Sequence, residues 1–116
     1  MINSISSTLS GLNAHTKKME VAANNIANIN TDDFKKSRAV FKEEANGEVR
    51  VDIQRIETGG NPIPFAEGEK TSAKTSNVDY AEEAVSMMIA NRGLEANLKA
   101  LQIDEEMKGS ILDIIT

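Results

Sequence analysis

The chain has 116 residues, a formal net charge of −5 and no cysteine. A chain of this length forms one domain at most, and we expect a single elongated domain over residues 1–116. An acidic chain cannot neutralise many phosphates, which excludes nucleic acid as an expected partner. The lack of cysteine excludes disulfides and thiolate chemistry, and no apolar run approaches the roughly 20 residues that span a bilayer.

The first seven residues, MINSISS, contain no basic residue and no continuous apolar stretch. They lack the form of a cleavable secretory signal. We therefore expect that the protein is cytoplasmic or leaves the cell by a route that uses no such signal.

Residues 3–30 are predicted to form a long helix, because apolar residues recur at alternating steps of three and four and no proline interrupts them. The stripe expected to face a partner helix consists of Ile2, Ile5, Leu9, Leu12, Thr16, Met19, Ala23 and Ile26. The helix is expected to stop at residues 30–33, since Asn and Asp tolerate left-handed backbone geometry better than most residues. Phe34 then anchors the exit of the chain.

Four asparagines lie within residues 24–30, which is costly because Asn is a poor helix former. Asn24 and Asn28 are four residues apart and share a face away from the apolar stripe. Two interpretations are open: the amides bond to a neighbouring molecule, or the segment is only a helix end that dissolves into a turn. We favour the first, and we include Asn25 in it.

Residues 37–57 are predicted to form a β-hairpin. Asn46-Gly47 is a strong turn signal because both residues accept positive φ, and apolar residues alternate with polar ones after it. Two strands alone are marginal in water, so the hairpin has to pack on a helix or on another chain. Residues 58–76, rich in glycine, proline and serine, are expected to form an extended, mobile linker.

Residues 79–114 are predicted to form a second long helix, with Asp79 as N-cap and Glu82 as its capping-box partner. One apolar stripe consists of Ile89, Gly93, Ala96, Ala100, Ile103, Met107 and Ile114, and another of Leu94, Leu98, Leu101 and Leu112. Two stripes need more cover than one partner helix provides. The predicted fold is therefore mainly α: two long terminal helices packed as a coiled-coil-like pair, with a small β-hairpin and an extended loop between them.

The sequence offers little for catalysis. His15 is the only histidine, and we interpret it as an exposed helix residue. A helical di-metal site needs two histidines, and the chain has no zinc-ligand spacing, phosphate-binding glycine loop or nucleophile elbow. We expect no enzymatic activity, no cofactor, no metal and no small-molecule substrate. The basic cluster of Lys35, Lys36 and Arg38 is interpreted as a solvated turn.

Two segments resemble the signatures of bacterial flagellar rod and hook proteins. The first is residues 23–31 followed by 34–37, which read ANNIANINT and FKKS. The second lies in residues 76–112 and contains Ser76-Asn77-Val78-Asp79, Glu83, Met88-Ile89, Arg92, Glu95-Ala96-Asn97, Asp104-Glu105-Glu106-Met107 and Leu112. The chain departs from the family pattern at Asp32-Asp33, where Pro-Gly is usual, and at Leu94, where an aromatic residue is usual.

This resemblance implies a structural subunit of the flagellar basal-body rod. Such a subunit is exported through the flagellar type III apparatus, occupies the periplasmic rod and assembles with itself and other axial proteins into a hollow helical shaft. The short segment between the signatures is most similar to the short proximal-rod branch of the family. The alternative is a cytoplasmic coiled-coil adaptor or a flagellar export chaperone, which explains the helices and the acidity but not the paired signatures.

The residues that we expect at contacts between subunits come from both helices and the turn after the first. They are Ile5, Leu9, Leu12, Met19, Asn24, Asn25, Ile26, Asn28, Phe34, Ile89, Arg92, Ala96, Asn97, Ala100, Ile103 and Met107.

Overall fold

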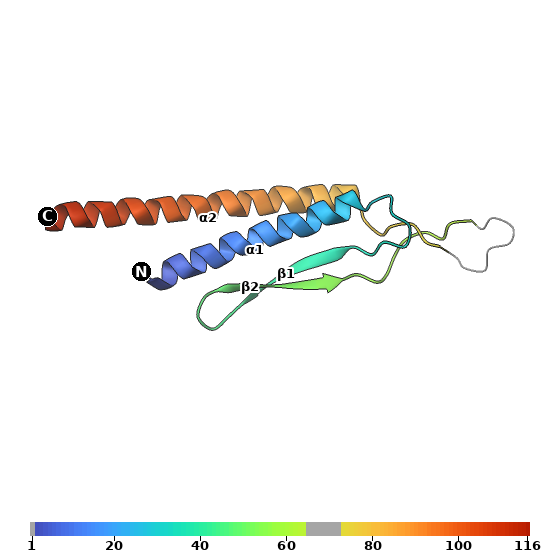
Figure 1. Cartoon of the computed structure of the whole chain (residues 1–116), viewed down its shortest axis with the longest axis horizontal. Coiled ribbons are helices and arrows are strands. Elements are labelled where there is room, and N and C mark those ends of the chain that lie inside the picture. The colour runs from blue at the N-terminus through green and yellow to red at the C-terminus, as the bar shows by residue number, and fades with distance from the viewer. Residues whose placement is uncertain (1, 65–72) are drawn as a thin grey trace.

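The computed structural model describes residues 2–64 and 73–116. Its elements are α1 (Ile2–Ala27), β1 (Ser37–Glu43), β2 (Val49–Arg55) and α2 (Tyr80–Ile115). The helices lie side by side and run in opposite directions, and α1 lies between α2 and the hairpin (Figure 1). The predicted fold class is confirmed: a pair of long helices with a two-stranded antiparallel hairpin between them in the sequence.

The molecule is long and thin, with extents of 82 × 25 × 14 Å. Its radius of gyration is 20.7 Å, against about 13 Å for a compact domain of similar length. Among the described residues the buried apolar side chains are only Ala14, Ala22 and Ala90. Three methyl groups remove little apolar surface from water, and the large apolar side chains of the described residues are half-buried or exposed.

Helix α1 ends at Ala27, three residues before the expected end, and the chain continues in turns to residue 33. Asp33 adopts the left-handed backbone conformation expected of this stretch, with φ of 58°. Its backbone N–H donates to the Lys74 carbonyl oxygen at 2.7 Å, and its carboxylate accepts from the Lys74 N–H at 2.8 Å. The turn after α1 is thereby tied to the segment that leads into α2.

The hairpin pairs residues 37–43 with residues 49–55, from Ser37 opposite Arg55 to Glu43 opposite Val49. In the turn only Gly47 has positive φ, at 81°, and its N–H donates to the Glu44 carbonyl oxygen at 2.9 Å. The Glu44 N–H donates to the Glu48 carbonyl oxygen at 2.9 Å. The predicted turn at Asn46-Gly47 therefore closes with one left-handed residue.

Serines on α1 hold the tip of the hairpin. The Ser7 hydroxyl donates to the Gly47 carbonyl oxygen at 2.7 Å, and the Val49 N–H donates to the Ser10 hydroxyl oxygen at 2.9 Å. The Ser6 hydroxyl bonds to the Glu48 carboxylate and helps to hold the pKa of that group below its ordinary value. The hairpin therefore packs on α1, as its marginal size requires.

The connection from β2 to α2 contains an isolated antiparallel bridge between Pro62 and Lys74. The Ile63 N–H donates to the Ala73 carbonyl oxygen at 2.9 Å beside it. The linker predicted over residues 58–76 includes 65–72, and the expected mobility of that stretch lies outside the described residues.

Asp79 caps α2 as predicted: its Oδ1 accepts from the N–H groups of Ala81 at 2.9 Å and Glu82 at 3.2 Å. The expected reciprocal bond from the Glu82 side chain is replaced by ion pairs. The Glu82 carboxylate lies 2.6 Å from Lys36 Nζ and 3.6 Å from Arg38 Nη2. Two cations attract a carboxylate more strongly than one neutral N–H group does.

Candidate functional site

The two helices approach most closely where their side chains are smallest. A Cβ added to Gly11 would lie 2.9 Å from Asn97 Nδ2, and one added to Gly93 would overlap the imidazole ring of His15. Ala22 on α1 and Ala90 on α2 are almost completely buried. Small residues on both helices therefore set the register of the antiparallel pair.

The apolar stripe predicted for the first helix is not this contact line, and the prediction is corrected here. Leu9, Thr16 and Ala23 are exposed, while the remaining described members, Ile5, Leu12, Met19 and Ile26, are half-buried. The positions that meet α2 include Gly11, His15 and Ala22, each one residue earlier than a predicted position. One residue rotates the helix face by about 100°, so the predicted stripe flanks the contact instead of forming it.

His15 is not an exposed helix residue, as the sequence had suggested. Its ring packs against Gly93 of α2 on one side and lies edge-to-face with Phe41 of β1, with ring centroids 5.2 Å apart. The Nδ1 atom is buried and has no hydrogen-bond partner. Burial, and to a smaller degree the positive charge of Lys18, lowers the pKa of His15 below its ordinary 6.5.

Asn25 is completely buried, with 0% of its surface exposed, and its amide is used within the chain. Its Nδ2 donates to the Ser37 carbonyl oxygen at 2.8 Å, and its Oδ1 accepts from the Ser37 N–H at 3.0 Å. The expectation that Asn25 contacts a neighbouring subunit is therefore corrected. The side chain serves as a peptide-like partner that fixes the first residue of β1 against the end of α1.

The other residues of the asparagine segment remain nearer the surface. Asn28 is half-buried at the helix end, where its Nδ2 donates to the Asn24 carbonyl oxygen at 2.9 Å and its Oδ1 accepts from the Thr31 hydroxyl at 3.1 Å. Asn24 is exposed. Phe34 is half-buried, and its carbonyl oxygen accepts from the Asn77 N–H at 3.4 Å. The two sequence signatures thus meet in space beside the base of the hairpin.

Asn77 is a structural residue whose role the sequence did not reveal. Its Oδ1 accepts from the Lys36 N–H at 2.6 Å, and its Nδ2 donates to the carbonyl oxygens of Ile56 at 2.7 Å and Thr58 at 2.8 Å. It joins the entry of the hairpin, the exit of the hairpin and the start of α2. The available signal was its place two residues before the helix cap Asp79, which indicates a turn but not these partners.

The basic cluster before β1 is also less solvated than expected. Only 12% of the Lys36 side chain is exposed where it pairs with Glu82, and Lys35 Nζ donates to the Gly59 carbonyl oxygen at 2.9 Å. These lysines fasten the segment before β1 to the start of α2 and to the loop after β2.

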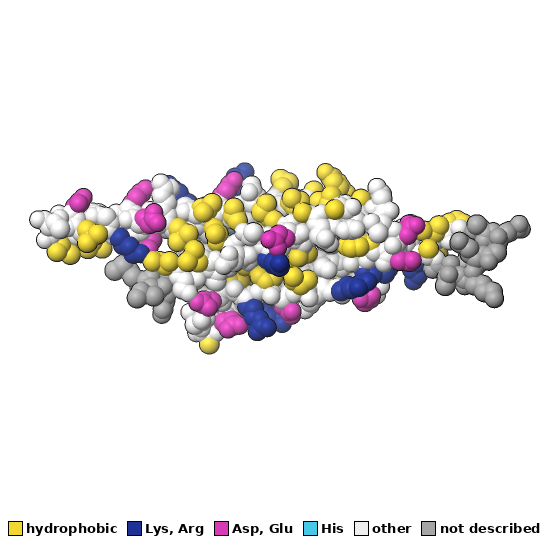
Figure 2. Space-filling view, viewed as in Figure 1, with side chains coloured by type: hydrophobic (Ala, Val, Ile, Leu, Met, Phe, Trp, Pro, Cys, Tyr) yellow, Lys and Arg dark blue, Asp and Glu magenta, His cyan; other side chains and the backbone are white. Residues whose placement is uncertain are grey.

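Large apolar side chains remain exposed along α2, and Figure 2 shows them gathered along this helix. Met88 is 68% exposed, Ile103 45% and Met107 58%. Further members of this surface are Val85, Ile89, Ala96, Ala100, Ile111, Leu112 and Ile114. We call these residues the α2 stripe. An apolar surface of this length usually marks a place where another protein binds.

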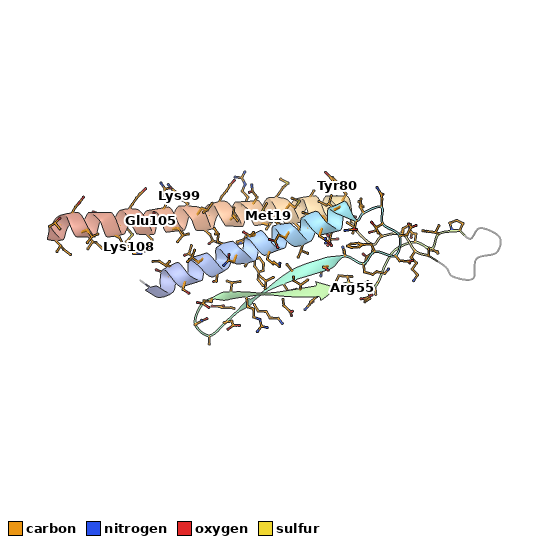
Figure 3. The ribbon with its side chains drawn as sticks, viewed as in Figure 1. Met19, Arg55, Tyr80, Lys99, Glu105 and Lys108 are labelled. Atoms are coloured by element: carbon orange, nitrogen blue, oxygen red, sulfur yellow. The ribbon has the colours of Figure 1, made fainter. Side chains whose placement is uncertain are left out.

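Polar residues interrupt and border the α2 stripe. Arg92 is exposed and pairs with Glu95 at 3.1 Å, whereas Asn97 is half-buried against Gly11. Figure 3 shows Tyr80 and Lys99 on the side of α2 away from α1. Of the expected contact residues on this helix, Ile89, Arg92, Ala96, Ala100, Ile103 and Met107 are exposed, which leaves them free to meet another chain.

The described residues offer a binding surface, and we identify no reaction centre among them. Within residues 2–64 and 73–116, no group of three His, Asp or Glu side chains is arranged to hold a metal ion. In the same residues, no helix is both long and apolar enough to cross a membrane. The arrangement can bind other helices along α2.

Comparison with known proteins gives matches at both ends of the chain. The family model described as "Flagella basal body rod protein" matches residues 5–35, and the one described as "Flagellar basal body rod FlgEFG protein C-terminal" matches residues 71–114. The first match covers residues 23–31 and the first two residues of 34–37, and the second match includes the whole second signature segment.

Individual relatives match over a short stretch. The flagellar basal-body rod protein FlgG of Bacillus subtilis is 49% identical over 43 residues, which are 37% of this chain and 16% of that protein. The flagellar hook protein FlgE of Borreliella burgdorferi is 49% identical over 43 residues, or 37% of this chain and 10% of the relative. The flagellar hook protein FlgE of Helicobacter mustelae is 51% identical over 41 residues, which are 35% of this chain and 9% of that protein. The matched stretch thus spans less than one fifth of these relatives.

Proposed function

Because the chain belongs to the family of flagellar rod and hook proteins, we propose that it is a structural subunit of the flagellar axial assembly and that it binds copies of itself and related axial proteins through its helices. The α2 stripe carries this proposal. It runs along α2 beside the side that packs on α1, with Ala100, Ile103 and Met107 next to Ile5 and Thr8. Its side chains stay exposed in the single chain, so a further helix is needed to cover it. Rod and hook proteins are structural and are not enzymes, and the proposal gives this chain no catalytic role.

The finer assignment is a proximal-rod subunit of the basal body, like the short rod protein FlgC. Only residues 36–70 separate the two matched regions, and the described structure there contains a single hairpin. Such a subunit is exported by the flagellar type III apparatus without a cleaved signal, resides in the periplasmic rod and helps to enclose a central channel.

The proposal is tested by the form of the complexes. Purified chain, alone and mixed with other axial proteins of the same bacterium, is examined by sedimentation velocity and negative-stain electron microscopy. We expect open-ended polymers that lengthen with concentration, because a repeated contact between different surfaces gives a helical filament whenever its rotation does not close a ring. Closed complexes of fixed size with one partner would support the adaptor or export-chaperone alternative instead.

The proposed contact residues are those expected from the sequence, with Asn25 removed. Asn24 tests the polar part of this set, because its side chain is exposed. Asn24→Ala is expected to raise intrinsic helix stability by roughly half a kcal/mol and yet to weaken assembly, since an amide partner on the neighbour loses its bond at about 1–3 kcal/mol. Polymer yield is compared with helicity by circular dichroism. Undiminished assembly would remove Asn24 from the contact set.

A further inference from the structure

Three elements meet at the His15 ring. The ring projects from α1, lies on the bare backbone of Gly93 in α2 and stands at 79° to the ring of Phe41 in β1. The ring fits on α2 only because residue 93 has no Cβ. His15 therefore belongs at once to the contact of α1 with α2 and to the contact of α1 with the hairpin.

This site accepts a neutral imidazole and disfavours a charged one. A proton on a neutral ring can sit on Nε2, which leaves Nδ1 as an acceptor without a partner. The imidazolium donates from both nitrogens, and Nδ1 is buried with no acceptor. The charged form would thus add an unpaired buried donor and a desolvated charge.

The charged groups on each neighbouring element do not compensate such a charge. On α1, Lys18 opposes it and already lies over the Phe41 ring, with Nζ 5.6 Å from the centroid. On α2, the positions beside Gly93 along the contact line are Ala90 and Asn97, which are uncharged.

Charged groups lie further away on both partner elements. On α2, Arg92 and Glu95 are exposed and form an ion pair with each other, with Arg92 Nη1 3.1 Å from Glu95 Oε2. On the hairpin, the face of Phe41 carries Glu43 two residues further along β1, and that residue is exposed.

We propose that His15 is an acid-sensitive joint: the neutral ring holds α2 and the hairpin against α1, and its protonation releases both. The joint is a property of the single chain and does not depend on assembly. The lowered pKa of His15 decides in which direction folding stability changes with pH. The unfolded chain binds a proton near pH 6.5 before the folded chain does, so stability is complete above that pH and is lost as the pH falls below it.

The test uses the whole chain. Because His15 is the only histidine, its ring gives a single set of imidazole proton resonances by NMR. We expect a titration midpoint below 6.5, together with a melting temperature, followed by circular dichroism, that falls by several degrees between pH 7.5 and 5.5. Glu48 and Asp52 do not interfere, since each has a lowered pKa and ordinary values of 4.5 and 3.8.

Two variants separate the joint from general acid sensitivity. His15→Gln cannot titrate, and its melting temperature should stay nearly constant over the same range. Gly93→Ala keeps the histidine, but the added methyl group occupies the place where the ring packs on α2. The midpoint of the imidazole titration should then rise towards 6.5. The proposal is overturned by a wild-type midpoint at or above 6.5, by wild-type pH dependence in His15→Gln, or by the lack of a cooperative melt at pH 7.5.

Discussion

Asn25→Ala is expected to cause the largest loss of stability of any single truncation near the hairpin. The substitution removes both hydrogen bonds to Ser37, at 2.8 and 3.0 Å. Each backbone group left unpaired in a buried place costs about 1–3 kcal/mol. A thin molecule whose described apolar core is three alanines has little stability to lose, so we expect much of the population to unfold at 37 °C.

Urea unfolding followed by helix circular dichroism measures this loss as a lower midpoint at an unchanged slope. The matched control is Asn24→Ala, one residue earlier on the same helix, where the side chain is exposed. That variant should be as stable as the wild type or slightly more stable. Equal midpoints for Asn25→Ala and Asn24→Ala would show that the bonds to Ser37 contribute nothing measurable.

The second large effect is on assembly. The double variant Ile103→Asp, Met107→Asp is expected to abolish polymer formation while the single chain stays folded. Both side chains are about half exposed, at 45% and 58%, so their replacement changes the stability of the free chain little. A carboxylate enclosed in a helix contact without a partner costs several kcal/mol, and two of them recur at every subunit.

The control carries the same change of charge on a different face of α2. The double variant Asn91→Asp, Gln102→Glu replaces two exposed amides with carboxylates. Each replacement adds one negative charge and leaves the side-chain volume almost unchanged. Polymer mass by sedimentation and motility of cells that carry each variant are the readouts. Normal assembly of the Ile103, Met107 variant, with or without a defect in the control, would place the contact on another face.

The elements of the fold were predictable because their signals are local. A regular apolar period predicted both helices, Asp79 marked the start of the second, and Asn46-Gly47 marked the hairpin. The relative placement of the helices was not predictable in this way. Large apolar residues dominate a periodicity argument, whereas the closest approach on α1 runs through Gly11, His15 and Ala22, each one position from a predicted residue. On α2 the predicted stripe did include Gly93, which lies against His15.

The roles of the buried polar residues also depended on tertiary structure. Asn25 bonds to a residue twelve positions further along the chain, and Asn77 joins segments 19 to 41 positions away. Sequence alone identifies these amides as unusual but cannot tell an internal partner from an external one. His15 is a similar case, because its surroundings come from α2 and β1.

The narrow line of small residues between the helices reverses the usual relation between burial and tolerance. In most domains a buried position fails when its side chain is cut back, since a cavity remains. Gly11, Ala22, Ala90 and Gly93 have almost nothing to cut back. At these positions harm comes from added atoms, which would force the helices apart along their length. Variation at these small residues is therefore limited by size alone, whereas the chemical requirements of the interior fall on Asn25 and His15.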